Sequence, residues 1–187
     1  MQYKERNIPD AFQDEWSDLL RDALNTIGCL RLHNSIEKTE TRFFECISRF
    51  EETFTRYDFD QQITLLFELG AVIAHLYIEK YAWHWVCGAD KKERQFFFLS
   101  SSDNKFILQP WPLTKTCLQR SSRQLLLRQV LSIPEFLELR HDKSEDEDFV
   151  GSRIISMETV YSLHRELTRL AAESEETRLA IKSEGLL

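Results

Sequence analysis

The sequence predicts an α+β, mostly helical fold, with about five helices around a small three-stranded antiparallel meander. Long segments at both ends carry apolar residues at spacings of three and four, which is typical of amphipathic helices. Short runs in the middle are rich in aromatic and branched residues and are bounded by turn formers. Five glycines and four prolines in 187 residues are too few for turn-rich all-β or nucleotide-binding folds.

Three helices are expected before the meander, over residues 10–32, 35–56 and 58–80. Asp10 is the expected N-cap of the first helix, because its carboxylate can accept a free backbone N–H. The third helix is apolar over a wide surface and should be central. Gly70 lies in its middle, where glycine costs about 1 kcal/mol relative to alanine. We therefore expect a close contact between Gly70 and a neighbouring helix or sheet.

From residue 82 the spacing of apolar residues changes from that of helices to that of strands. Residues 82–87, 94–100 and 105–108 predict three antiparallel strands, and Pro110 and Pro112 end the third. Alternation places Trp83 and Trp85 on one face of the sheet and His84 on the other.

A fourth helix is expected over residues 113–131, and Pro134 should begin a short amphipathic piece. Residues 141–150 follow as a solvated loop or hinge, and a last helix starts near Ser156. The whole chain, residues 1–187, is predicted to form a single domain. The acidic residues of the loop are Asp142, Glu145, Asp146, Glu147 and Asp148.

The charge balance narrows the class of partner. With 31 acidic and 24 basic side chains the net charge is −7, which argues against binding to a nucleic-acid backbone. It suits plain solubility or attraction to a basic partner. The N-terminal residues have no apolar signal region and the apolar runs are short, so we expect a cytoplasmic protein that does not span a membrane. The four cysteines are expected to be free, buried thiols.

Catalytic motifs are absent from the sequence: no nucleophile elbow, phosphate-binding loop or dinucleotide-binding motif occurs. His75 and Glu79 share a helix face, with His84 on the next strand, but an ordinary surface pair explains them better than a metal site. We therefore expect no metal and no cofactor. An enzyme or ligand-binding protein with a site around His75, His84 and Tyr161 stays as an alternative.

Two features suit protein binding. The five acidic residues of the loop 142–148 would speed the encounter with a basic protein. Trp83 and Trp111 would serve as aromatic anchors if one face of the sheet were open.

Residues 65–120, about a third of the chain, resemble a group of uncharacterised bacterial domains. The shared features are a Leu-Gly-Ala helix (Leu69-Gly70-Ala71), a Trp-bearing strand (Trp85), a short meander and a strand ending in proline (Pro110). The sequence departs from that pattern at Val72, where an aromatic is usual, and at Ala74, the second small residue. The resemblance implies the fold and a setting near toxins, and it carries over no active-site residue.

The leading hypothesis is therefore a protein-binding module, most concretely a bacterial immunity-type inhibitor that masks a toxin. A homodimeric structural or regulatory subunit, paired through the last helix, is a third possibility. The partner is expected to be a protein, and a basic toxin is the most concrete choice.

Overall fold

The computed structural model describes residues 4–6, 8–29, 35–53, 56–89, 94–118, 123–141, 153–155 and 165. Its elements follow one another as β1 (Lys4–Arg6), α1 (Asp10–Thr26), α2 (Ile36–Thr53), α3 (Phe59–Tyr81), β2 (His84–Ala89), β3 (Gln95–Ser100), β4 (Phe106–Leu108), α4 (Pro110–Leu118), α5 (Arg123–His141) and β5 (Arg153–Ile154). The predicted mostly helical α+β class is confirmed.

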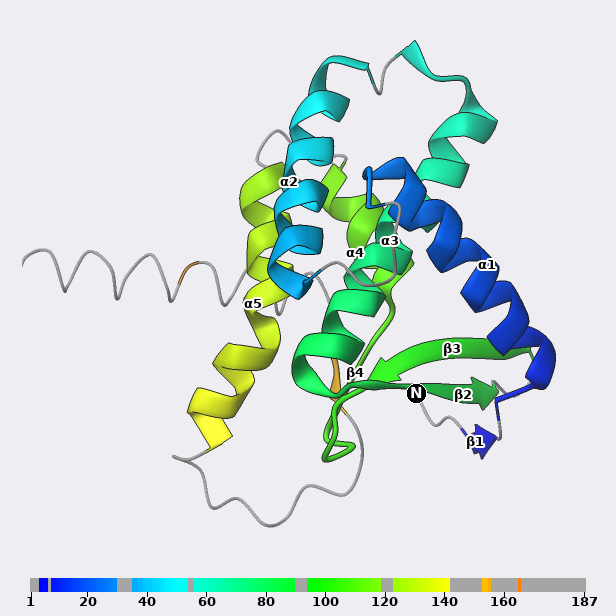
Figure 1. Ribbon diagram of the computed structural model, residues 1–187. Coiled ribbons are helices and arrows are strands. Elements are labelled where there is room, and N and C mark those ends of the chain that lie inside the picture. The colour runs from blue at the N-terminus through cyan, green and yellow to red at the C-terminus, as the bar shows by residue number, and fades with distance from the viewer. Residues whose placement is uncertain are drawn as a thin grey trace, which may run out of the picture.

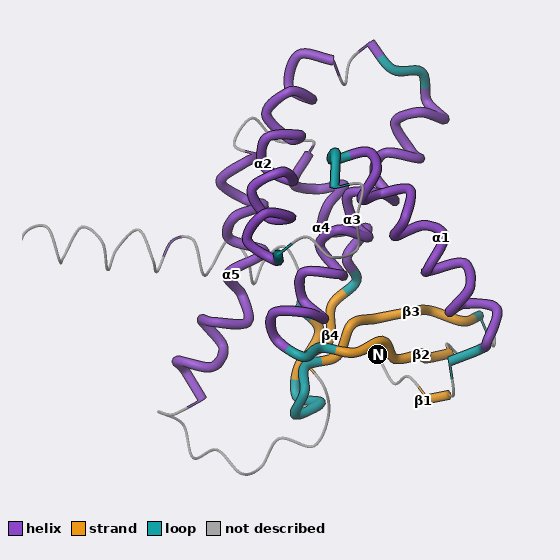
Figure 2. Tube along the Cα trace, viewed as in Figure 1, coloured by secondary structure: helices purple, strands orange, loops and turns teal. Residues whose placement is uncertain are grey.

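The sheet has the strand order β1-β2-β3-β4-β5. Its centre is the predicted meander, in which β2, β3 and β4 pair antiparallel. The outer strands are additions: β1 pairs antiparallel with β2, and β5 pairs parallel with β4. Figures 1 and 2 show the helices gathered on one side of the sheet, with α1 on one flank of α3 and with α2 and α5 on the other.

Helix α3 is the centre of the helical layer, because α1, α2, α4 and α5 all pack against it. Leu69, Ile73, Leu76 and Tyr77 supply fully buried side chains from α3 to the core. By length and composition alone, α3 is also the one helix in the described ranges that could cross a membrane. Half of its most apolar window is buried within the fold.

The start of α3 is set by a capping box. The Asp58 carboxylate accepts a hydrogen bond from the Gln61 backbone N–H at 2.8 Å, and Gln61 Oε1 accepts one from the Asp58 N–H at 3.1 Å. At the other end, Ala82 adopts the left-handed conformation with φ 55°, which stops the helix after Tyr81.

We expect Asp58→Ala to lower the free energy of unfolding by about 1 kcal/mol, because the Gln61 backbone N–H loses its side-chain acceptor. Asp58→Asn is the matched control, since asparagine also caps helices, and it should stay within a few tenths of wild type. Urea denaturation followed by circular dichroism measures both. Equal stability of the Ala and Asn variants would show that the box contributes nothing.

The close contact expected at Gly70 is confirmed. Trp111 of α4 lies directly over this residue, and a Cβ placed on Gly70 would be 2.6 Å from Trp111 Cδ1. The glycine therefore lets α4 approach α3 more closely than any other residue would allow.

Several boundaries differ from the expectation. Helix α1 ends at Thr26, before Gly28 with φ 76°, and its N-cap is Pro9, so Asp10 is the first helical residue and caps nothing. The first predicted strand begins at His84, not at residue 82, because α3 runs to Tyr81 and Ala82 turns the chain.

The predicted helix over 113–131 is wrong in both bounds. Pro110 and Pro112 lie in the first turn of α4, where proline is tolerated because those N–H groups have no helical acceptor. Pro134 begins no new element but lies inside α5. The expected loop starts after His141, which still belongs to α5. The rest of the loop and the last helix from Ser156 lie outside the described residues.

Candidate protein-binding surface

Three large apolar side chains lie open to solvent on the first half of α3. Phe59, Ile63 and Phe67 are 73%, 37% and 45% exposed. Their spacing of four places them on one face of the helix, and we call these three residues the apolar stripe. Tyr57, just before the helix, is the other large exposed apolar residue in the described part of the chain.

Helix α4 explains why only this half of the face is open. One turn beyond Phe67 the same face reaches Gly70, where Trp111 covers it. The ring centroids of Phe67 and Trp111 are 5.8 Å apart, and Trp111 Nε1 donates a hydrogen bond to the Phe67 carbonyl at 3.2 Å. The stripe is thus the continuation of a packed face beyond the end of its covering helix.

A row of aromatic rings supports the stripe from below. Trp111 stacks on Trp85 of β2, with ring centroids 5.6 Å apart. Trp85 in turn meets Trp16 and Phe12 of α1 edge-on, at 5.0 and 5.3 Å. Because these rings pack on one another, the Phe67 end of the stripe rests on a base that runs down to the sheet.

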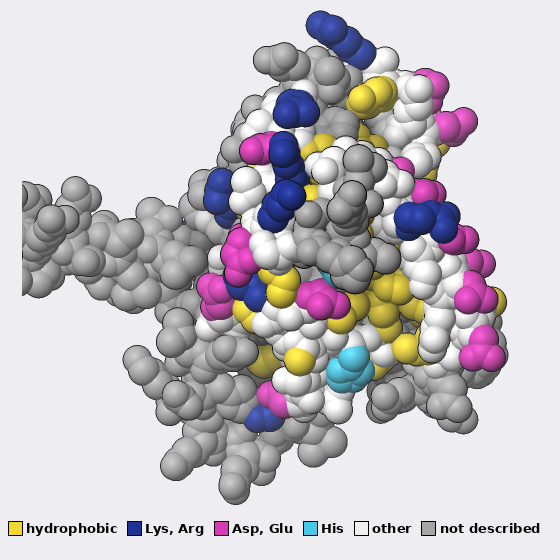
Figure 3. Space-filling view, in the orientation of Figure 1, with side chains coloured by type: hydrophobic (Ala, Val, Ile, Leu, Met, Phe, Trp, Pro, Cys, Tyr) yellow, Lys and Arg dark blue, Asp and Glu magenta, His cyan; other side chains and the backbone are white. Residues whose placement is uncertain are grey.

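Carboxylates lie beside the stripe. Viewed down the axis of α3, Asp60 lies next to Phe67 on the side toward α1. Thr64 and Glu68 lie farther round on the same side. A hollow of about 370 Å³ opens there, and its wall is formed by Thr26, Tyr57, Asp58, Asp60, Gln61, Thr64, Leu65 and Glu68. Figure 3 shows acidic side chains along the outer edge of α1 as well.

Glu68 is the most enclosed of these carboxylates. It accepts a hydrogen bond from Thr26 Oγ1 at 2.7 Å. Burial raises the pKa of Glu68, and the charge of Asp22 raises it further. A carboxylate with a raised pKa favours the approach of a positive charge, because a cation would offset the cost of its burial.

The two tryptophans predicted as partner anchors lie in different environments. Trp83 is 4% exposed, and its ring packs edge-on against Tyr77 at 4.9 Å, so it belongs to the core. Trp111 is half-buried and lies at the end of the apolar stripe. The acidic residues Asp142, Glu145, Asp146, Glu147 and Asp148 lie outside the described residues.

The alternative site around His75, His84 and Tyr161 gains no support from geometry. His75 is half-buried on α3, where burial lowers its pKa, and His84 is exposed at the start of β2. No hydrogen bond joins the two histidines, and Tyr161 falls outside the described residues. In the described ranges, no three His, Cys, Asp or Glu side chains come together as a metal site.

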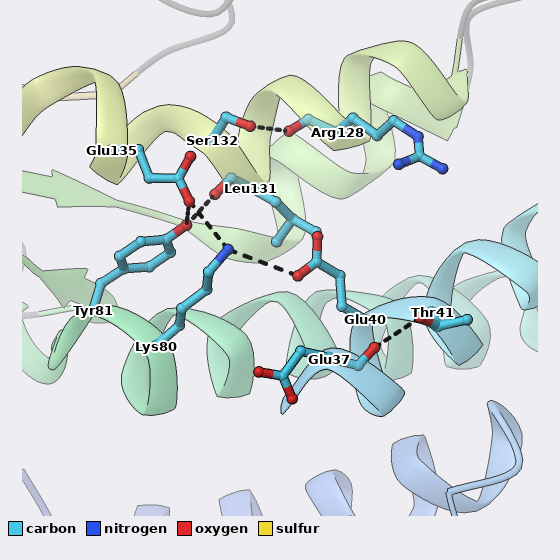
Figure 4. A network of polar contacts seen from close by, with 9 residues as sticks. All are labelled: Glu37, Glu40, Thr41, Lys80, Tyr81, Arg128, Leu131, Ser132 and Glu135. Carbon is cyan, nitrogen blue, oxygen red and sulfur yellow. Dashed lines mark hydrogen bonds and ion pairs between the residues drawn. The ribbon is translucent and has the colours of Figure 1, made fainter. Parts of the chain in front are cut away.

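A second polar cluster joins α2, α3 and α5 (Figure 4). Lys80 Nζ lies 3.1 Å from Glu135 and 3.8 Å from Glu40, and the Tyr81 hydroxyl donates to Glu135 at 2.7 Å. The contact with Tyr81 raises the pKa of Lys80, and the Tyr81 hydrogen bond lowers the pKa of Glu135. Both groups therefore stay charged at neutral pH, and the cluster holds three helices together.

A shallow hollow of about 420 Å³ borders this cluster, and its wall is formed by Glu37, Glu40, Thr41, Phe44, Glu45, Ser48 and Arg128. The Arg128 guanidinium lies 4.1 Å from the centre of the Phe44 ring, so it forms a cation–π contact within the fold.

Burial raises the thiol pKa of Cys46 to about 11 and of Cys117 to about 12, so neither is a thiolate at neutral pH.

Apolar periodicity alone did not single out the apolar stripe, because the third helix is apolar over a wide surface. The available signal was that apolar residues surround the helix. A helix that is apolar on all sides needs neighbours around its whole length, and any part without one is exposed.

No protein-family model matches the chain, and neither a curated protein nor a solved structure matches it. The resemblance to bacterial domains near toxins therefore stays a prediction.

Proposed function

We propose that this protein is a protein-binding module, most concretely an immunity-type inhibitor that masks a toxin by surface complementarity. The observation that carries the proposal is the apolar stripe of Phe59, Ile63 and Phe67. Exposed apolar side chains that are contiguous and rigidly supported are typical of protein interfaces, where a few aromatic residues supply most of the affinity.

The rigid base of the stripe supports this function. An interface whose side chains are already ordered loses less conformational entropy on binding than a flexible one. Trp111 and Trp85 hold Phe67 in place before any partner arrives. The acidic balance of the chain and its resemblance to domains near toxins favour an inhibitor among the possible binding modules.

Replacing two stripe residues should weaken binding strongly and leave the fold intact. The stripe variant, Phe59→Ser with Ile63→Ser, spares Phe67 because that ring contacts Trp111. Phe59 is 73% exposed but Ile63 only 37%, so we expect a loss of stability of about 1–2 kcal/mol, mainly from Ile63, which leaves the protein folded. Affinity for the partner should fall by about tenfold or more, as it does when interface anchors are truncated.

Affinity capture from a lysate of the native host, read by mass spectrometry, measures this loss. Lys38→Ser with Glu45→Ser, on the exposed face of α2, is the control variant with no net change of charge. We expect one stoichiometric protein on the wild type and the control, and its loss from the stripe variant. Equal capture by all three, or by none, would contradict the binding function.

The inhibitor function needs a further readout. The captured protein is expressed alone and together with this chain, and growth of the cells is followed. We expect growth arrest that co-expression of the wild type relieves and co-expression of the stripe variant does not. A captured protein without toxicity would leave a binding module that is not a toxin inhibitor.

A further inference from the structure

The charge around the apolar stripe has one sign. From Tyr57 to Ala74 the sequence contains no lysine or arginine but three carboxylates, at Asp58, Asp60 and Glu68. Helix α1, which packs against α3, carries five acidic side chains and one basic residue, Arg21. The stripe is therefore bordered by negative charge on the side that faces α1.

The carboxylates nearest the stripe are not neutralised within the fold. Asp58 is occupied as the helix cap. Asp60 and Glu68 form no ion pair with any lysine or arginine in the described part of the chain, and Glu68 accepts only the Thr26 hydroxyl. A positive charge in the hollow that both residues line would be attracted by each of the two carboxylates.

We infer that the apolar stripe and the carboxylates of Asp60 and Glu68 together bind a basic amphipathic helix of a partner protein. Its apolar side chains, repeating every three or four residues, would lie on Phe59, Ile63 and Phe67. Lysine or arginine side chains along one edge of that helix would enter the hollow beside Glu68. This inference rests on the proposed protein-binding function and names the chemistry of its partner.

Two other occupants are disfavoured by charge. A second copy of this chain, paired through the same face, would bring the carboxylates that border one stripe near those that border the other. Like charges opposed across an interface are unfavourable and suppress that pairing. An anionic lipid surface would meet the same repulsion from this edge.

Synthetic peptides test the inference with the full chain. The probe is an 18-residue helical peptide with leucine at every third or fourth position and lysine on both flanks. Its controls are the same peptide with glutamate in place of lysine, and a shuffled lysine peptide that has no apolar face. Isothermal titration calorimetry is run with the wild type, the stripe variant and Asp60→Asn with Glu68→Gln.

We expect the lysine peptide to bind the wild type about tenfold or more tightly than either control peptide, with an affinity that falls as salt rises. The affinity of the stripe variant for the lysine peptide should be lower than that of the wild type by about tenfold or more. The Asn/Gln variant should reduce the preference for lysine over glutamate by about threefold to tenfold, because only the charge has changed. Lys38→Ser with Glu45→Ser should bind like the wild type.

Equal affinity for the lysine and glutamate peptides would overturn the inference, and so would full lysine-peptide binding by the stripe variant. Stripe-dependent binding to vesicles of phosphatidylcholine and phosphatidylserine, or stripe-dependent dimerisation in light scattering, would assign the surface to a membrane or to a second copy. Failure of the binding function itself looks different, because no host protein is then captured through the stripe. Capture through the stripe with no lysine-peptide binding would keep the binding function and remove the basic helix.

Discussion

Gly70→Ala is expected to lower the free energy of unfolding by about 1–3 kcal/mol, although alanine is the better helix former. The added Cβ would lie 2.6 Å from Trp111 Cδ1 and close to the indole Nε1 at 3.1 Å. Real Cβ atoms do not approach other atoms so closely, so either the indole or the two helices must move.

The indole has little freedom to move. It stacks on Trp85, contacts Phe67 and donates a hydrogen bond to the Phe67 carbonyl. Displacing it would disturb the row of rings that joins α1, α3 and the sheet. The strain of overpacking should therefore exceed the gain in helix propensity of about 1 kcal/mol.

A double-mutant cycle isolates the contact. In a Trp111→Leu background the indole is absent, so Gly70→Ala should become stabilising by about 0.5–1 kcal/mol through propensity alone. Urea denaturation of the four proteins gives the coupling energy. The same loss from Gly70→Ala in both backgrounds would show that Trp111 is not the obstacle.

Tyr77→Phe is expected to destabilise the protein by about 1–3 kcal/mol, because it leaves a buried carbonyl without a donor. Pro134 lies inside α5 and has no N–H, so the Val130 carbonyl four residues earlier loses its helical hydrogen bond. The fully buried Tyr77 hydroxyl of α3 donates to this carbonyl.

A second tyrosine of α3 lies against the neighbouring turn. The Tyr81 hydroxyl is 3.2 Å from the Leu131 carbonyl, and it donates its proton to Glu135 at 2.7 Å. Burial raises the pKa of Tyr77 well above that of a free tyrosine, so its hydroxyl keeps its proton and remains a donor at all physiological pH values.

Pro134→Ala provides the test of this assignment. An alanine at position 134 restores an N–H that can donate to the Val130 carbonyl, so Tyr77→Phe should then cost about 1 kcal/mol less than in the wild type. Thermal and urea unfolding of the four proteins measure the coupling. A cost of Tyr77→Phe that does not depend on position 134 would separate the tyrosine from the proline.

Local patterns predicted much of this fold. The apolar spacing of α1, α2 and α3 depends only on residues within a few turns, and the alternation in β2 and β3 depends on immediate neighbours. The glycine in α3 was informative because it breaks a local rule, and a close contact was the physical reason.

The candidate site was harder to predict. Of the named anchors, Trp111 lies at the apolar stripe, whereas Trp83 is in the core. Both are tryptophans in short apolar segments, and nothing local separates them. Their exposure depends on which helix lies over each side chain.

The sequence by itself determined the three helices before the meander and the meander itself, because these preferences arise from neighbouring residues. Only the tertiary structure decided the remainder. Strands β1 and β5, of three and two residues, have no periodicity of their own and exist through pairing with β2 and β4. Pro134 remains in a helix because a tyrosine more than 50 residues earlier supplies the missing donor. The apolar stripe is exposed because α4 covers this face of α3 at Gly70 and not before Phe67. How much of one helix another helix covers depends on the packed fold and not on the sequence of either segment.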